Sequence, residues 1–70
     1  MKVIVLKTDI SSKRKLNFLM PVLNDHQAIK SWSVDTKDID NVLRIETKEQ
    51  LLEKEVIRLI GEHGFIGEGL

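Results

Sequence analysis

Short apolar segments alternate along the chain with two amphipathic ones, and this pattern predicts most of the secondary structure. Residues 2–7 hold four consecutive apolar positions rich in β-branched side chains, which is typical of a central strand. Residues 28–35 and 42–46 alternate apolar and polar positions, as strands with one buried face do. Residues 65–68 predict a short final strand.

The segment 13–23 predicts an amphipathic helix, because its apolar side chains recur three and four positions apart on one face. These side chains are Leu16, Leu19, Met20 and Leu23, widened on one side by Phe18 and Val22. Ser11 or Ser12 can cap the helix with a hydroxyl. Pro21 has no N–H and clashes with the carbonyl of Asn17, so we expect a kink or an early end of the last turn.

Residues 47–50 have the Thr-x-x-Gln spacing of a capping box, which predicts that a second helix opens there. Its apolar face comprises Leu52, Val56, Leu59, Ile60 and His63. Gly64 suits the left-handed residue that follows a helix end. Residues 35–41 are polar and rich in turn formers, and they predict a hairpin between the two middle strands.

The predicted order is strand, helix, strand, strand, helix, strand. This order indicates an α+β ferredoxin-like fold, a four-stranded antiparallel sheet with two helices on one face. We expect one domain over residues 1–70. In this fold the loop 8–12, the hairpin 35–41 and the turn at 63–64 lie at one end of the sheet. The loop that carries His26 lies at the other end.

Composition narrows the classes of function. Eleven basic residues balance eleven acidic ones, and Trp32, Phe18 and Phe65 are the only aromatic residues, so a nucleic-acid surface is not expected. The chain has no cysteine, which removes disulfides, thiol nucleophiles and thiolate metal sites. The longest uninterrupted apolar run is too short to enter a membrane, and the N-terminal residues lack the apolar core of a signal peptide. We therefore expect a cytoplasmic protein.

Two segments resemble the heavy-metal-associated domains of copper chaperones and metal-pumping ATPases. Residues 28–35, Ala-Ile-Lys-Ser-Trp-Ser-Val-Asp, are similar to the Gly-Val-x-Ser-Val-x-Val-Asp strand of that family. Val56, Ile60 and the pair Gly64-Phe65 are similar to its Ile, Ile and Gly-Tyr close. The resemblance covers essentially the whole length, and it implies the same ferredoxin-like fold.

The family's Met-x-Cys-x-x-Cys loop would fall on residues 7–12, and there this chain departs from the family. Asp9 and Ser12 then stand where the two thiolates belong, and Lys7 stands where a buried methionine normally sits. Cu(I) prefers soft sulfur ligands, which a carboxylate and a hydroxyl do not replace. We therefore expect no cofactor and do not transfer the family's metal-carrying activity to this chain.

The remaining pattern favours a non-catalytic binding or interaction module, such as an adaptor or regulator in a metal-related system. Lys13, Arg14 and Lys15 occupy the first turn of a predicted helix, where cations oppose the helix dipole. Such a cluster suits an anion or an acidic protein surface. The expected binding surface comprises Thr8, Asp9, Ser11, Ser12, Lys13, Arg14, Lys15 and Phe65. No serine or threonine has a recognisable base motif around it, so we expect no enzyme.

Two alternatives remain open. Asp9 and His63, helped by Asp38 or Asp40, could bind a hard or borderline cation. Against this, His63 ends an apolar helix face and Asp9 precedes a helix as a partner of its dipole, which explains both without a metal. In the second alternative, unpaired groups on the edge strands pair two copies, so the chain is either a monomer or a weak homodimer.

Overall fold

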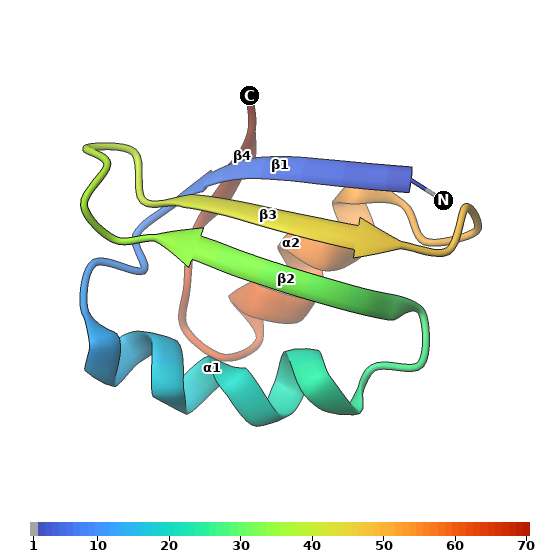
Figure 1. Cartoon of the computed structure of the whole chain (residues 1–70), viewed down its shortest axis with the longest axis horizontal. Coiled ribbons are helices and arrows are strands. Elements are labelled where there is room, and N and C mark those ends of the chain that lie inside the picture. The colour runs from blue at the N-terminus through green and yellow to red at the C-terminus, as the bar shows by residue number, and fades with distance from the viewer. Residues whose placement is uncertain (1) are drawn as a thin grey trace.

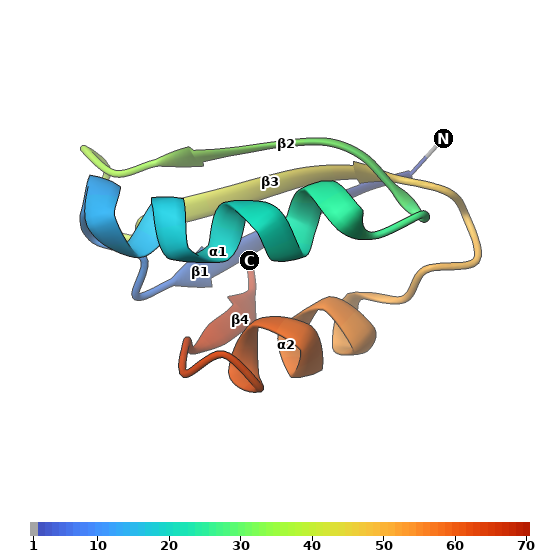
Figure 2. The same cartoon turned by 90° about the horizontal axis from the view of Figure 1, so that it is seen from below.

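The computed structural model describes residues 2–70, which form a four-stranded sheet with two helices (Figure 1). The elements are β1 (Lys2–Thr8), α1 (Lys13–Asp25), β2 (Ile29–Asp35), β3 (Val42–Thr47), α2 (Glu53–Gly61) and β4 (Gly67–Gly69). The strand order is β2-β3-β1-β4, and every neighbouring pair is antiparallel. Both helices lie on the same side of the sheet (Figure 2), which confirms the predicted ferredoxin-like fold.

The core lies between the helices and the inner face of the sheet. β1 and β3 supply cross-strand pairs there, with Ile4 opposite Ile45 and Leu6 opposite Leu43, and all four side chains are buried. The outer face of the sheet carries no helix, so Val3 on that face is 45% exposed. Period-two alternation therefore predicts the buried face of these strands correctly. No helix in the described part of the chain is long and apolar enough to span a bilayer.

Helix α1 runs through Pro21 and ends at Asp25, so the expectation of an early end is wrong. Pro21 removes one intrahelical bond, the one that the carbonyl of Asn17 would accept. Asn17 and Pro21 are both exposed, and water can reach this carbonyl. The helix is held by its other face, on which Leu19 and Leu23 are completely buried.

Helix α2 begins five residues later than the capping-box spacing predicts, with its N-cap at Leu52 instead of Thr47. Thr47 is the last residue of β3, opposite Lys2 of β1 and Ile29 of β2, and its side chain is fully buried. The N-cap of α2 is Leu52, whose side chain makes no capping hydrogen bond. Sheet pairing on both sides thus overrides the local capping signal. Gly64 has a φ of 87°, as predicted for a residue that follows a helix end.

Thr47→Val is expected to stabilise the protein by about 1–2 kcal/mol. The Oγ1 atom of Thr47 is buried without a hydrogen-bond partner among residues 2–70, and valine has nearly the same shape. Urea unfolding followed by circular dichroism measures the change in the free energy of unfolding. Thr47→Ser keeps the unpaired hydroxyl and loses a methyl group, so this control should destabilise the fold. A valine variant less stable than wild type would contradict the prediction.

Leu52→Ser is also expected to stabilise, by about 0.5–2 kcal/mol, because serine can supply the missing N-cap hydrogen bond of α2. The leucine side chain is 42% exposed, so its removal costs little apolar burial. Thermal unfolding reports the change as a higher Tm. Leu52→Ala removes the same side chain without adding a cap. The serine variant should melt above the alanine variant, and equal melting temperatures would contradict the capping argument.

Candidate functional site

Three connections meet at one end of the sheet, as the sequence predicts. The amide of Thr8 donates to the carbonyl of Asp40 in the β2–β3 hairpin at 3.0 Å. The Oδ1 atom of Asp9 accepts from the amide of Ile66, in the turn between α2 and β4, at 2.8 Å. The β1–α1 loop therefore contacts both other connections. The other end of α1, which His26 caps, lies at the opposite end of the molecule (Figure 1).

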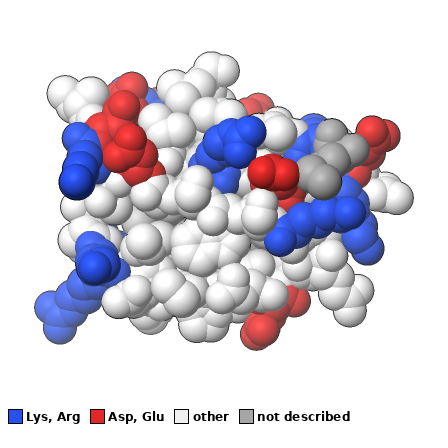
Figure 3. Space-filling model, viewed as in Figure 1, with Lys and Arg blue, Asp and Glu red and all other residues white. Residues whose placement is uncertain are grey.

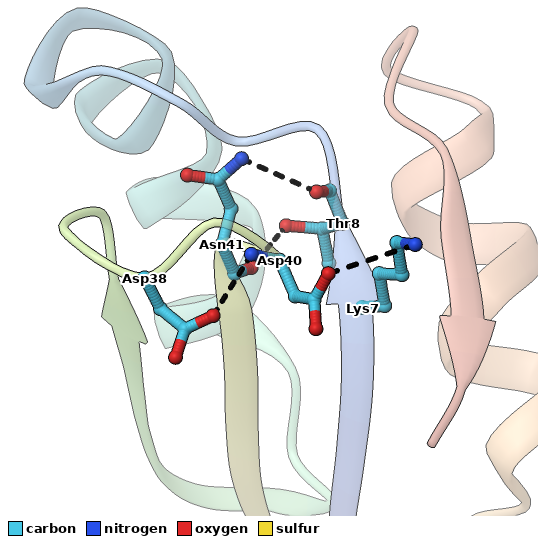
Figure 4. Close-up of polar contacts among 5 residues, drawn as sticks. All are labelled: Lys7, Thr8, Asp38, Asp40 and Asn41. Atoms are coloured by element: carbon cyan, nitrogen blue, oxygen red, sulfur yellow. Dashed lines mark hydrogen bonds and ion pairs between the residues drawn. The ribbon is translucent and has the colours of Figure 1, made fainter.

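Internal hydrogen bonds engage the polar side chains of the β1–α1 loop. The hydroxyl of Thr8 donates to the carbonyl of Asn41 at 2.6 Å and accepts from the amide of Ile10 at 3.2 Å. Figure 4 shows this link between β1 and the hairpin. The Oγ atom of Ser12 caps α1 by accepting from the amide of Lys15 at 3.3 Å. These side chains fix the loop conformation, and this structural role explains them without a ligand.

Lys7 points away from the core rather than into it. Its side chain is 52% exposed, and its Nζ atom lies 3.6 Å from the Oδ1 atom of Asp40 (Figure 4). The resemblance to heavy-metal-associated domains implied a buried methionine at this position. Here the ion pair instead ties β1 to the hairpin, and an exposed pair of this kind contributes less than about 1 kcal/mol.

The candidate metal ligands are each engaged by other groups. Besides the bond from Asp9 to Ile66, the Nδ1 atom of His63 donates to the carbonyl of Leu59 at 3.0 Å. The carboxylate of Asp40 pairs with Lys7. Within residues 2–70, no three His, Cys, Asp or Glu side chains gather closely enough to hold a metal ion. The structure thus brings Asp9 near the turn that follows His63 without forming a ligand cluster.

The three cations that begin α1 are exposed, and they differ in their contacts. The Nζ atom of Lys15 donates to the hydroxyl of Ser11 at 3.2 Å and folds back over the loop. The side chains of Lys13 and Arg14 make no hydrogen bond or ion pair within the described residues. The first turn of α1 contains no acidic residue, so no local carboxylate balances these charges.

An aromatic pair, one ring exposed and the other half-buried against the core, lies next to these cations. Phe18 is 63% exposed, and its ring centroid lies 6.3 Å from that of Phe65, with the rings inclined by 56°. Arg14 precedes Phe18 by four residues, so the two side chains are neighbours on the helix surface. We call the set Lys13, Arg14, Lys15, Phe18 and Phe65 the basic–aromatic patch. Sequence reasoning assigned Phe18 to the apolar face of the helix and missed its place in this patch.

Charge is unevenly distributed over this end of the molecule. In Figure 3 basic side chains stand without acidic neighbours at the lower left, where α1 begins. Acidic side chains gather at the upper left, with basic ones beside them, over the β2–β3 hairpin, which holds Asp35, Asp38 and Asp40. A balanced total charge therefore conceals two local regions of opposite sign.

One open groove of about 530 Å³ lies elsewhere, between α2 and the residue that follows α1. Its lining mixes both charges and comprises His26, Lys54, Glu55, Arg58, Leu59 and Glu62. The Nδ1 atom of His26 accepts from the amide of Ala28 at 3.1 Å, so the histidine is part of the local turn. The groove contains none of the predicted site residues.

Comparison with known proteins places the fold. No protein-family model and no curated sequence matches the chain. Two solved structures match it over its full length. One comes from work on crosstalk between Cu(I) and Zn(II) homeostasis, with a TM-score of 0.84, 8% identity and full coverage of both chains. The other is the copper transporter domain CCC2A of yeast, solved in apo and Cu(I)-loaded states, with a TM-score of 0.82, 13% identity and 96% of that chain covered.

These similarities define the class of protein by architecture. The chain shares the ferredoxin-like fold of both structures. At 8% and 13% identity the likeness shows the fold and not the ligand. What the chain does has to be argued from its own surface.

Proposed function

We propose that this domain is a non-catalytic protein-interaction module of the cytoplasm that binds an acidic partner through the basic–aromatic patch. One observation carries the proposal. Lys13 and Arg14 begin α1 exposed and without ion pairs in the described structure, and they adjoin the exposed ring of Phe18, which contacts the half-buried ring of Phe65. Cations at this place work against the helix dipole, so the fold itself gains nothing from them.

The chemistry of the patch suits a protein surface that combines carboxylates with apolar groups. Exposed aromatic rings supply contact area with little side-chain entropy to lose, and arginine forms paired hydrogen bonds to a carboxylate. The unpaired N–H groups at the start of α1 add a weak preference for negative charge. Electrostatic attraction raises the association rate with the acidic partner, and the aromatic rings provide most of the apolar contact.

Lack of cysteine argues for an adaptor or regulator rather than a metal carrier. Asp9 and Ser12 stand where a thiolate pair would be. Their side chains accept hydrogen bonds from the amides of Ile66 and Lys15. Since the matching folds come from copper and zinc homeostasis, we propose that the partner belongs to a metal-related system.

The test uses a synthetic probe, a 12-residue peptide rich in glutamate and leucine, titrated into labelled protein while backbone amide NMR is recorded. The expected shifts cluster at residues 13–18 and at Phe65. Replacing Lys13, Arg14 and Lys15 by glutamine should weaken binding about tenfold, because each exposed charge contact is worth roughly 0.2–1 kcal/mol. Raising the salt concentration should weaken the wild-type complex in the same direction.

The matched control replaces three exposed lysines elsewhere, Lys30, Lys48 and Lys54, by glutamine. It lowers the net charge by the same amount without touching the patch. If both triple variants lose the same affinity, binding follows total charge and the assigned surface is wrong. If neither loses affinity, the patch does not bind acidic proteins.

A second candidate is a cation site that uses Asp9 and His63, favoured by the metal-related matches of the fold. The Nδ1 atom of His63 donates to Leu59, which leaves Nε2 of the neutral ring as the ligand atom. Its partner Asp9 would have to release the amide of Ile66. Isothermal titration with Zn(II) tests this site. Binding that disappears in both Asp9→Ala and His63→Ala would support it.

A further inference from the structure

Ile39 is the most exposed large apolar side chain of residues 2–70, at 94% of its accessible surface. It lies at the tip of the β2–β3 hairpin, between Asp38 and Asp40. An isolated exposed leucine or isoleucine needs no explanation on most surfaces. This one is unusual because the hairpin that carries it is held in one conformation.

Hydrogen bonds on both flanks fix the hairpin tip. The amide of Asp40 donates to the Oδ1 atom of Asp38 at 2.8 Å, and the amide of Asn41 donates to the carbonyl of Asp38 at 3.0 Å. Thr8 then ties the far side of the hairpin to β1 through its amide and through its hydroxyl. Figure 4 shows the bond made by the hydroxyl. Ile39 is therefore presented by a preorganised turn, which lowers the entropy cost of using it as an anchor.

The charges around Ile39 complement those of the basic–aromatic patch. The hairpin 35–41 holds three aspartates and one lysine, whereas residues 13–15 hold three cations. Asp40 is partly neutralised by Lys7, which leaves Asp35 and Asp38 as the carboxylates outside ion pairs in the described structure. The hairpin thus offers an apolar tip with an acidic rim, and the patch offers apolar rings with a basic rim.

We propose that the occupant of the basic–aromatic patch is the Ile39 hairpin of a second copy of this chain. The apolar tip contacts the rings of Phe18 and Phe65, and the carboxylates of Asp35 and Asp38 face Lys13 and Arg14 of the other copy. This inference rests on the proposed function, because it names one acidic partner for the same patch. Self-association then competes with other acidic partners and regulates access to the patch.

The positions of the two surfaces allow the contact to form twice. The hairpin and the start of α1 both lie at the left end of the molecule in Figure 1, one above the other. Two copies that face each other across a two-fold axis can therefore place each hairpin against the partner's patch. Each contact is small, so we expect a weak dimer. Over protein concentrations of roughly 0.01–1 mM, it should be populated mainly toward the upper end.

Sedimentation equilibrium over that concentration range is the test, with amide NMR to confirm that each variant is folded. Ile39→Thr should raise the dimer dissociation constant at least about tenfold, because it removes both apolar anchors. The matched control is Val3→Thr, the same kind of change at a 45% exposed position on the outer face of the sheet. Val3→Thr should leave the dissociation constant within about twofold.

A mixing experiment tests the pairing itself. Arg14→Glu disables the patch and Ile39→Thr disables the hairpin, so each variant alone should be monomeric. An equal mixture should recover a heterodimer with one intact contact, of intermediate affinity. A wild type that stays monomeric, or a dimer that Ile39→Thr does not weaken, would overturn the inference. Amide shifts in the dimer confined to β2 would overturn it too, because they indicate pairing of edge strands.

The two proposals fail separately. If the wild-type protein binds the acidic peptide but stays monomeric, the self-association proposal is wrong and the proposed function as an interaction module stands. A dimer that depends on Ile39 but not on Lys13 and Arg14 overturns the self-association as proposed, and the peptide titration alone then decides whether the patch binds acidic proteins.

Discussion

Asp9→Cys combined with Ser12→Cys is expected to give this fold a Cu(I) site with one ion per chain. The two positions have the Cys-x-x-Cys spacing and begin and end the bend that leads from β1 into α1. The overall backbone resembles that of a yeast domain solved with Cu(I) bound, at a TM-score of 0.82. Soft thiolates are the ligands that Cu(I) prefers, so the change from oxygen to sulfur should decide the affinity. Competition with a Cu(I)-specific chromophoric chelator measures it.

Each single cysteine variant serves as a control for the double one. A lone thiolate lacks a second sulfur, so both single variants should lose the competition with the chelator. The double variant gives up the hydrogen bond to the amide of Ile66 and the cap on Lys15, so we expect its apo form to be about 1–3 kcal/mol less stable. A folded double variant that binds no Cu(I) would show that the loop geometry itself differs from that of a metal carrier.

Leu19→Ala is expected to remove about half of the stability of the domain. Leu19 is completely buried on the inner face of α1. Deleting a buried leucine side chain costs about 2–5 kcal/mol, because a cavity remains where it packed. A chain of 70 residues has roughly 4–10 kcal/mol of total stability, so this loss is about half of the total and should lower the urea midpoint strongly. Urea unfolding would show this directly.

Met20→Ala is the matched control, one residue along the same helix. Its side chain is 36% exposed, and alanine has the higher helix propensity, so the loss should stay below about 1 kcal/mol. Equal losses at the two positions would mean that α1 packs on the sheet with a different face from the one described.

The sequence predicts the buried framework and the start of α1 well, and it predicts the end of α1 and the start of α2 poorly. Leu43 and Ile45 alternate with polar residues, and they face the core as period two requires. Thr47 fails as a predicted helix cap because its environment is set by β1 and β2, which are distant in sequence. Pro21 fails as a predicted helix end because its cost falls on a solvent-exposed carbonyl. Local sequence signals for helix ends therefore mislead where a contact with a distant strand, or access to water, decides the conformation.

The same distinction between features that the sequence predicts and features that it does not predict applies to the candidate site. That the loop and the two other connections lie together follows from topology alone, and the bonds of Asp9 and Thr8 to those connections agree with it. The pairing of Phe18 with Phe65 joins α1 to the turn before β4, and helix periodicity carries no sign of it. The exposed position of Ile39 is equally hidden, because an isoleucine in a polar stretch gives no indication of direction.

The most direct test of the central claim is a titration of the wild-type protein with Cu(I) and then Zn(II), followed by backbone amide NMR. The claim is that this end of the fold recognises proteins without a metal ion. We expect no site-specific shift at Asp9, Ser12, His63 or the β2–β3 hairpin, while the acidic peptide still shifts residues 13–18 in the same sample. Shifts confined to Asp9, the hairpin and His63 on addition of metal would contradict the claim and establish a metal site with oxygen and imidazole ligands.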